Sequence, residues 1–200
     1  MCIFISVITM SSRDEIVVFT DGSTTDNGFK TAKSCSAVVF PNKEIPDSFF
    51  FLPPESNRSN NRAEYYAAIK AMELSNEYDI EKIKTLHIYT DSMLLLNTCT
   101  KWMKNWEKKG WKKSGNGIIK NLDLVKILYD HCNERKIEWT HVKAHTGLKD
   151  YNSFWNDKVD KLASENCHKD DISYVVFEKN QDEYTPSIKS FFNKKRKSSD

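Results

Sequence analysis

The chain has 200 residues, 39% of them hydrophobic, five cysteines and a formal net charge of +2. This length and composition predict one domain with a substantial core. The cysteines are odd in number and form no C-x-x-C pair, which argues against a disulfide framework and a zinc site. We therefore expect a reducing compartment inside the cell, nuclear or cytoplasmic. We also expect a monomer.

Residues 1–10 are apolar but too short to span a membrane, and they lack the basic start and cleavage site of a secretory signal. We expect residues 1–14 to be a dispensable extension, with Met10 as an alternative start, and no membrane association.

The first structured stretch follows directly. Residues 16–19 are apolar and largely β-branched or aromatic, as in a buried strand, and the run leads into Asp21-Gly22-Ser23. This order places a carboxylate where the strand leaves the core. A buried, ionised carboxylate costs several kcal/mol unless a cation compensates it. Asp-Gly is also a common hairpin signal, so a simple turn is the alternative.

Residues 36–40 and 48–52 are typical of two further strands, and the short connections between them predict an antiparallel meander. A polar loop over 56–61 then leads into a predicted helix over 62–77. Glu64 shares a stripe of small residues with Ala68 and Ala71, so its carboxylate should face the sheet. Asn61-x-x-Glu64 also resembles a capping box, in which Glu64 would serve only the helix start.

The rest of the chain alternates between strands and helices. A strand over 85–90 runs into Asp91, and Ser92 is placed to cap the helix that follows. We expect a helix from 118 to about 133, a strand over 137–142, a polar loop over 143–153 and a helix over 154–166. Asp160 borders the apolar stripe of this last helix. The order of elements predicts an α/β architecture, a mixed sheet with helices packed on it.

Residues 101–113 carry six lysines and three tryptophans. A lysine run usually forms a solvated helix face, but such faces rarely hold three tryptophans. Lysines interleaved with aromatic residues fit a nucleic-acid backbone better. The candidate contacts in this segment are Trp102, Lys104, Trp106, Lys108, Lys109, Trp111 and Lys112.

Four acids lie at the borders of apolar elements: Asp21, Glu64, Asp91 and Asp160. If they converge, their mutual repulsion requires hard divalent cations as compensation. Paired metal ions activate water and stabilise a leaving oxygen at phosphorus. The sequence therefore points to metal-dependent phosphodiester hydrolysis.

Five short motifs also resemble, in order and spacing, the motif set of type 1 ribonuclease H. They are TDGS at 20–23, NNRAE at 60–64, TDS at 90–92, VKAH at 142–145 and NDKVDKLA at 156–163. The similarity extends from about residue 16 to 167 and implies a ribonuclease H domain over 15–168. Its fold would be a mixed five-stranded sheet, three antiparallel and then parallel strands, with helices packed on it. The lysine and tryptophan segment resembles the basic protrusion of this family, which integrase and transposase relatives lack.

The resemblance implies roles for individual residues. Asp21, Glu64, Asp91 and Asp160 match the four metal-binding carboxylates, which would hold two Mg²⁺ ions, with Mn²⁺ as an alternative. Asp157 is the other acid of its motif, but the family pattern places it off the metals. His145 matches a loop histidine associated with proton transfer or product release, and an unperturbed histidine titrates near ~6.5.

The implied nucleic-acid contacts lie on three segments. Positions that contact the minor groove of the hybrid are matched by Asn27, Asn60 and Asn61. A pocket for a DNA phosphate is matched by Ser59 and Asn121. Lys143, beside the histidine loop, is a further candidate. The family usually has a glycine cluster between its first two strands, whereas residues 26–31 here contain only Gly28. The resemblance therefore does not predict the path of the loop that carries Asn27.

The implied reaction is hydrolysis of the RNA strand of an RNA–DNA hybrid, leaving a 3′-hydroxyl and a 5′-phosphate, with a role in removing RNA primers or hybrids during replication. A catalytically silent hybrid-binding module is the main alternative, and loss of a carboxylate would favour it. A DNA-joining enzyme of the same fold is disfavoured by the basic protrusion and the histidine loop.

Residues 169–200 form a polar, basic tail that we expect to be flexible. Its end resembles a sliding-clamp-binding peptide, because Ile188 stands three positions before the pair Phe191-Phe192 and a basic run follows. Thr185 stands where such peptides usually carry glutamine. A docking helix on the domain and a nuclear-import signal are the alternatives.

Overall fold

The structure is a computed structural model that describes residues 14–52, 57–113, 115, 117–147 and 150–168. Its elements in chain order are β1 (Glu15–Thr25), β2 (Lys33–Val39), β3 (Ser48–Phe51), α1 (Asn60–Tyr78), β4 (Thr85–Thr90), α2 (Met93–Asn97), the π-helical turn η1 (Thr98–Trp102), α3 (Met103–Lys108), α4 (Leu122–Glu134), β5 (Ile137–His141) and α5 (Tyr151–Cys167).

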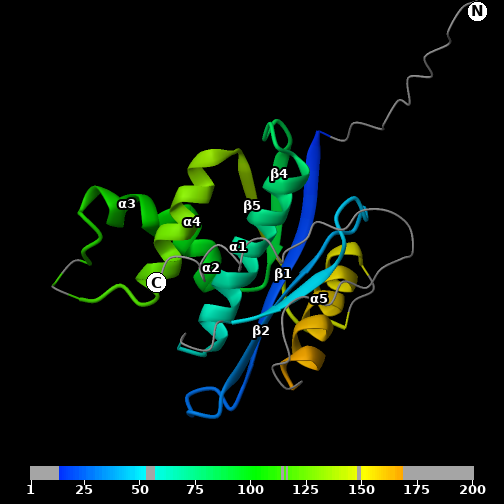
Figure 1. The fold of residues 1–200 in the computed structure, drawn as a ribbon, viewed down its shortest axis with the longest axis horizontal. Coiled ribbons are helices and arrows are strands. Elements are labelled where there is room, and N and C mark those ends of the chain that lie inside the picture. Colours follow the sequence, from blue (N-terminus) through cyan, green and yellow to red (C-terminus); the bar gives the residue numbers. More distant parts are fainter. Residues whose placement is uncertain (1–13, 53–56, 114, 116, 148–149, 169–200) are drawn as a thin grey trace, which may run out of the picture.

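The five strands form one sheet in the order β3-β2-β1-β4-β5 (Figure 1). The pairs β1–β2 and β2–β3, which short connections join, are antiparallel. The pairs β1–β4 and β4–β5 are parallel, as crossover connections through helices require. The predicted mixed sheet, with three antiparallel and then parallel strands, is confirmed.

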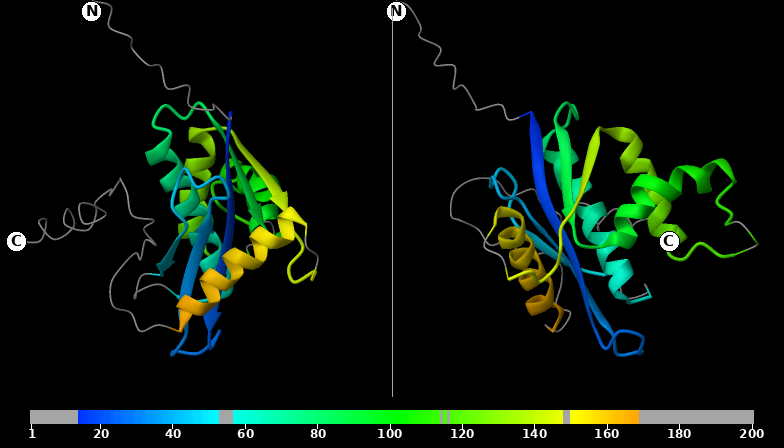
Figure 2. Two further views of the ribbon diagram at one scale, coloured as in Figure 1. Left: turned by 90° about the vertical axis from the view of Figure 1, so that its right-hand side faces the viewer. Right: turned by 180° about the vertical axis from the view of Figure 1, so that it is seen from behind.

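Helices cover both faces of this sheet. Alternate residues of β1 divide between two cores, since successive strand side chains point to opposite faces. Ile16 and Val18 belong to the core that α1 and α4 complete. Val17 and Phe19 belong to the core that includes Val159 of α5. Figure 2 shows α5 on the face of the sheet opposite α1 and α4. Burial of β1 on both faces explains its unbroken apolar run.

Several element boundaries differ from the prediction. β1 does not end at Asp21 but continues to Thr25, paired with β2 down to Lys33, so both the turn and the strand end expected at Asp21 are wrong. α1 begins at Asn60 with Ser59 as its N-cap, so the capping box that starts at Asn61 is wrong as well.

The two last helices also begin elsewhere than expected. α4 begins at Leu122, four residues later than predicted. α5 begins at Tyr151, three residues earlier, because Asp150 caps it by accepting a 3.0 Å hydrogen bond from the Ser153 backbone nitrogen. The predicted cap at Ser92 is confirmed, since its hydroxyl accepts from the Leu95 backbone nitrogen at 3.3 Å. The predictions for the tail, including Ile188, Phe191 and Phe192, lie outside the described residues.

Residues 93–113 leave the sheet and project to one side as α2, η1 and α3 (Figures 1 and 2). Leu95, Cys99 and Met103 are buried in the core beside α1 and α4 and anchor the base of this segment. Within the described part of the chain, no helix is long and apolar enough to cross a bilayer.

Candidate active site

Asp21 lies where β1 loses one of its two neighbours. Parallel pairing with β4 ends at Phe19 and Tyr89, whereas antiparallel pairing with β2 continues through Asp21 and Ala37. Asp91 directly follows the last residue of β4. The divergence of β1 and β4 therefore leaves two carboxylates at the same edge of the parallel pair.

Gly22 brings a helix against this edge. A Cβ atom at Gly22 would lie 2.2 Å from the backbone nitrogen of Glu64 and 2.3 Å from the carbonyl carbon of Ala63. Only glycine leaves room for so close an approach of β1 and the first turn of α1. The Ser36 hydroxyl on β2 holds the same turn by donating to the Ala63 carbonyl at 2.6 Å. These contacts place the Glu64 side chain beside Asp21.

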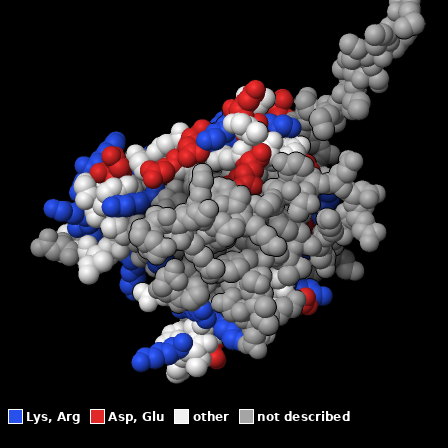
Figure 3. Space-filling model, viewed as in Figure 1, with Lys and Arg blue, Asp and Glu red and all other residues white. Residues whose placement is uncertain are grey.

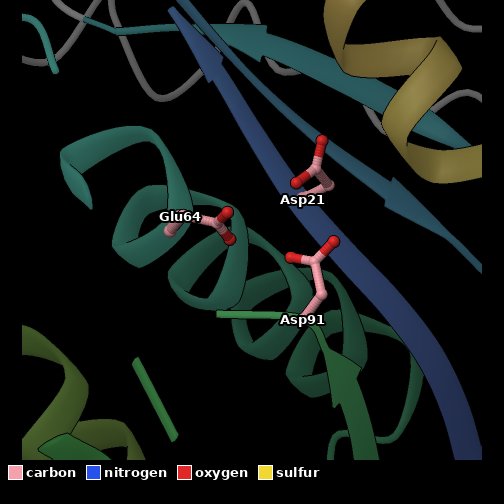
Figure 4. A group of neighbouring side chains, drawn as sticks. All are labelled: Asp21, Glu64 and Asp91. Atoms are coloured by element: carbon pink, nitrogen blue, oxygen red, sulfur yellow. The ribbon is translucent and has the colours of Figure 1, made fainter. Parts of the chain in front are cut away.

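Three carboxylates converge as a result. Asp21, Glu64 and Asp91 each offer an oxygen atom within 4.8 Å of the others, and Figure 4 shows them pointing toward one another from β1, α1 and the end of β4. Asp21 and Glu64 are 6% and 8% exposed. Among the described residues, Oε2 of Glu64 is buried without a hydrogen-bond partner. The cluster thus includes a buried oxygen ligand, Oε2 of Glu64, that no hydrogen bond from the described residues satisfies.

The electrostatics of the cluster call for a cation. Burial, reinforced by the negative charges of Asp91 and Asp160, raises the pKa of Asp21 to about 7. Burial, followed by the charges of Asp21 and Asp91, raises the pKa of Glu64 well above its usual range. Hard divalent ions such as Mg²⁺ prefer carboxylate oxygen ligands and would relieve this repulsion. The donor set therefore fits such an ion.

Asp160 lies beside the three converging carboxylates, on α5. It is half-buried, whereas Asp157 is exposed. Burial raises the pKa of Asp160, nearby His145 lowers it, and Asp91 and Asp157 raise it further. Its charge acts on Asp21 as well. The structure thus brings three of the four predicted carboxylates into one group and places the fourth at its border.

Asn156, one turn before Asp160 on α5, holds Asp91 in place. Its side chain is nearly fully buried and its Nδ2 donates to Oδ2 of Asp91 at 3.2 Å. The sequence did not identify this contact, although Asn156 lies in the last motif. A polar residue four positions before an acid, on the sheet-facing side of a helix, was the available signal.

His145 lies in the exposed loop between β5 and α5, in a left-handed conformation with φ 50°. Such a φ is uncommon for residues other than glycine. The loop is tied down at its start, where the Val142 backbone nitrogen donates to the Thr90 carbonyl at 2.9 Å. Further along, the hydroxyls of Thr146 and Ser153 lie 2.8 Å apart. Lys143 is exposed in the same loop.

The predicted nucleic-acid contacts of α1 and α4 lie together. Asn60 and Asn61 are exposed in the first turn of α1, and Ser59 is its N-cap. Asn121 is the N-cap residue of α4 and lies beside Arg62 of α1. Two helix N-termini therefore meet here. Asn27 lies elsewhere, in the exposed turn that follows β1.

The projecting segment carries a pocket of about 400 Å³ lined by Trp102, Asn105, Trp106, Lys109, Lys112 and Lys113. Lys104 and Lys108 are exposed on α3, and Figure 3 shows basic side chains gathered at the end of the molecule that carries α3. Trp111 differs, because its ring packs edge-on against Tyr129 with centroids 5.4 Å apart. This tryptophan anchors the segment to α4.

Comparison with known proteins gives the site its context. Residues 13–168 match the family model described as RNase H. The chain is 40% identical over 111 residues to the ribonuclease H of Novosphingobium aromaticivorans, covering 56% of this chain and 71% of that protein. It is 32% identical over 153 residues to the ribonuclease H of Mycolicibacterium smegmatis, covering 76% and 87%. Ribonuclease H1 of Homo sapiens is 35% identical over 153 residues, which cover 76% of this chain but only half of the human protein.

Solved structures show the same fold. LC9-RNase H1, described as a type 1 RNase H with the type 2 active-site motif, superposes with a TM-score of 0.61 at 23% identity, covering 76% of this chain and 72% of the other. The foamy viral protease-reverse transcriptase in complex with RNA/DNA hybrid gives 0.61 at 19% identity, covering 76% and 20%. The family resemblance predicted from the five motifs is confirmed. The chain belongs to the ribonuclease H family.

Proposed function

We propose that this protein is an endonuclease that hydrolyses the RNA strand of RNA–DNA hybrids and leaves 3′-hydroxyl and 5′-phosphate ends. The observation that carries the proposal is the convergence of Asp21, Glu64 and Asp91 at the divergence of β1 and β4. Relatives that align over most of the described chain are ribonucleases H, which makes RNA in a hybrid the first substrate to test.

Asp21, Glu64 and Asp91, with Asp160 at their border, would hold two divalent ions, Mg²⁺ or Mn²⁺. When bound, such ions would lower the pKa of a water, so that it can lose a proton and attack the phosphorus at neutral pH, and would supply positive charge that stabilises the leaving oxygen. The raised pKa values of Asp21 and Glu64 support this assignment, because they reflect burial of both carboxyl groups and, after it, the negative charge of neighbouring carboxylates.

The surrounding residues would keep the carboxylates in place and handle the proton. Asn156 holds one oxygen of Asp91, and Gly22 keeps the first turn of α1 against β1. His145 is exposed on its loop and close enough to lower the pKa of Asp160. It would donate a proton to the departing 3′-oxygen or assist product release. Imidazole suits this role near neutral pH.

Selectivity for a hybrid would come from contacts with both strands. Asn60 and Asn61 are exposed within one turn of Glu64, where their amides would hydrogen-bond 2′-hydroxyls of the RNA strand. Ser59 and Asn121 would contact a phosphate of the DNA strand. The exposed lysines of residues 101–113, with Trp102 and Trp106, would bind the hybrid backbone. Lys143 and, on its separate turn, Asn27 complete the proposed set.

The substrate is tested by incubating the protein with labelled RNA–DNA hybrid, double-stranded RNA and double-stranded DNA, each with Mg²⁺ and with chelator. We expect cleavage of the RNA strand of the hybrid alone, and only with Mg²⁺. Binding of the hybrid without cleavage in Mg²⁺ or Mn²⁺ would instead identify a silent binding module, and strand transfer on double-stranded DNA would identify a DNA-joining enzyme.

A role in replication rests on the tail, which lies outside the described residues. Ile188 and Phe191 would lie on one side of a helical turn and enter an apolar pocket of a sliding clamp, as in helix-in-groove recognition. A synthetic peptide of residues 183–200 should bind the clamp at micromolar strength. Replacing Phe191 and Phe192 by alanine should abolish clamp binding by the whole protein and leave hybrid cleavage unchanged. Equal clamp binding by the variant, or loss of cleavage, would refute the role.

A further inference from the structure

Arg62, two residues before Glu64 on α1, reaches across to the first turn of α4. Its Nη1 and Nη2 donate to Oδ1 and Oδ2 of Asp123 at 2.9 and 2.6 Å, the paired geometry in which a guanidinium binds a carboxylate most strongly. Its side chain is only 10% exposed, whereas that of Asp123 is 58% exposed. The helix N-termini of α1 and α4 are therefore joined by an ion pair that is buried on one side.

The same guanidinium also orients Asn121. Nη1 of Arg62 donates to Oδ1 of Asn121 at 3.5 Å. Arginine has only donors, so the side-chain oxygen of Asn121 must face Arg62 and the NH₂ group must turn away from it. The side chain of Asn121 does not cap α4, and its backbone is left-handed, with φ 56° and ψ 34°, a conformation that asparagine tolerates. The amide donor thus points away from the ion pair.

The ion pair between Arg62 and Asp123 affects how readily an anion can approach Asn121. Arg62 lowers the pKa of Asp123, which keeps the carboxylate ionised and bound to the guanidinium. Without Arg62, a carboxylate two residues from Asn121 would repel a phosphate. The N-termini of α1 and α4 both present positive helix ends here, which favours a negative ligand once that carboxylate is neutralised.

We infer that Arg62 is a positioning residue for substrate binding. By holding Asp123 and the oxygen of Asn121, it presents the Asn121 amide as a hydrogen-bond donor to one DNA-strand phosphate. Because Arg62 and Glu64 share the first turns of α1, it also fixes the spacing between that phosphate and the carboxylates that act on the RNA strand. The inference rests on the proposed function and adds Arg62 and Asp123 to its machinery.

The chain supplies a matched control at the other end of the same two helices. Arg135, just after α4, donates from Nη2 to Oδ2 of Asp79, just after α1, at 2.7 Å, and both side chains are buried. Replacing Arg135 by lysine should destabilise the α1–α4 packing at least as much as Arg62→Lys does, because this ion pair is more deeply buried and Arg135 also donates to Asn76 and to the Lys84 carbonyl. Arg135 lies at the opposite end of α4 from Asn121. Any effect common to both variants is structural.

The test measures hybrid affinity in chelator while single DNA phosphates are replaced, one position at a time, by uncharged methylphosphonates. In the parent, one position should weaken binding roughly tenfold, the range of a hydrogen bond to a charged group. Asn121→Ala, Arg62→Lys and Asp123→Asn should all reduce that position-specific loss to less than twofold, and Arg135→Lys should retain it. If Arg62→Lys does not fold, the same measurement on Asp123→Asn still tests the inference.

Retention of the full tenfold loss by Arg62→Lys or Asp123→Asn would overturn the inference, because the donor would then be positioned without them. Absence of any sensitive phosphate in the parent would overturn it too. Failure of the proposed function is a separate result, namely that the parent does not cleave hybrid in Mg²⁺.

Discussion

Replacing Asp21 by asparagine should stabilise the metal-free protein at neutral pH while removing its response to Mg²⁺. Asparagine has nearly the same shape but no charge, so the change removes one of the buried, mutually repelling carboxylates. Burial and the charges of Asp91 and Asp160 raise the pKa of Asp21 from 3.8 to about 7. At about 1.4 kcal/mol per pH unit, ionisation of Asp21 lowers the free energy of unfolding by at most about 4 kcal/mol.

The pH dependence has a defined sign. Between about pH 4 and pH 7 the folded protein keeps a proton on Asp21 that the unfolded chain has released. The free energy of unfolding of the metal-free parent therefore falls as the pH rises through this window. Asp21→Asn should lack that part of the decline, so the two proteins should have similar stability at pH 4 and the variant should be more stable at pH 8.

The assay is urea unfolding at pH 4 to 8, in chelator and in Mg²⁺. A ligand at about a hundred times its dissociation constant stabilises by about 2.7 kcal/mol, which should appear in the parent and largely disappear in the variant. Asp157→Asn is the control, since Asp157 is an exposed acid on α5. The reasoning is refuted if Asp21→Asn and the parent show the same pH profile, or if Mg²⁺ stabilises neither.

Three further changes test other parts of the site. His145→Ala should slow hybrid turnover by about 10²-fold, the low end of the range of about 10²–10⁴-fold that general acid–base groups contribute; full activity would leave His145 a simple loop residue. Gly22→Ala should abolish cleavage and lower the urea midpoint, because its methyl group would collide with the α1 backbone; an unchanged midpoint would contradict that packing. Replacing four lysines by alanine should weaken hybrid binding without slowing saturated cleavage, and each lost phosphate contact should flatten the plot of log affinity against log salt by about 0.9. The four residues are Lys104, Lys108, Lys109 and Lys112, and an unchanged slope would mean that they only form a solvated surface.

The order and type of the main elements could be predicted because local pattern determines them. The apolar run of β1 and the stripe of α1 show which residues must be buried. The end of β1 could not be read in this way. Asp21 and the polar residues after it stay in the strand because β2 continues to pair with them, while β4 has already diverged. Pairing with one neighbour and loss of the other is a tertiary property that residue types alone do not reveal.

In the site, too, some features follow from local sequence and others depend on tertiary structure. The four acids could be named from their motifs, but their supports depend on approaches between distant segments. Gly22 looked like a turn residue, yet it makes room for α1. Asn156 and Arg62 lie inside recognised motifs, but their partners Asp91 and Asp123 are 65 and 61 residues away. Trp111 shares the composition of the basic segment and nevertheless packs inward against Tyr129.

The most direct test of the account is the Mg²⁺ dependence of hybrid cleavage by the parent and by Asp21→Asn, with hybrid binding measured on the same samples. The account predicts that the parent cleaves the RNA strand only when Mg²⁺ is present. It predicts that Asp21→Asn binds the hybrid with affinity close to the parent's but does not cleave at any Mg²⁺ concentration. Comparable cleavage by the variant, or cleavage by the parent in chelator, would contradict it.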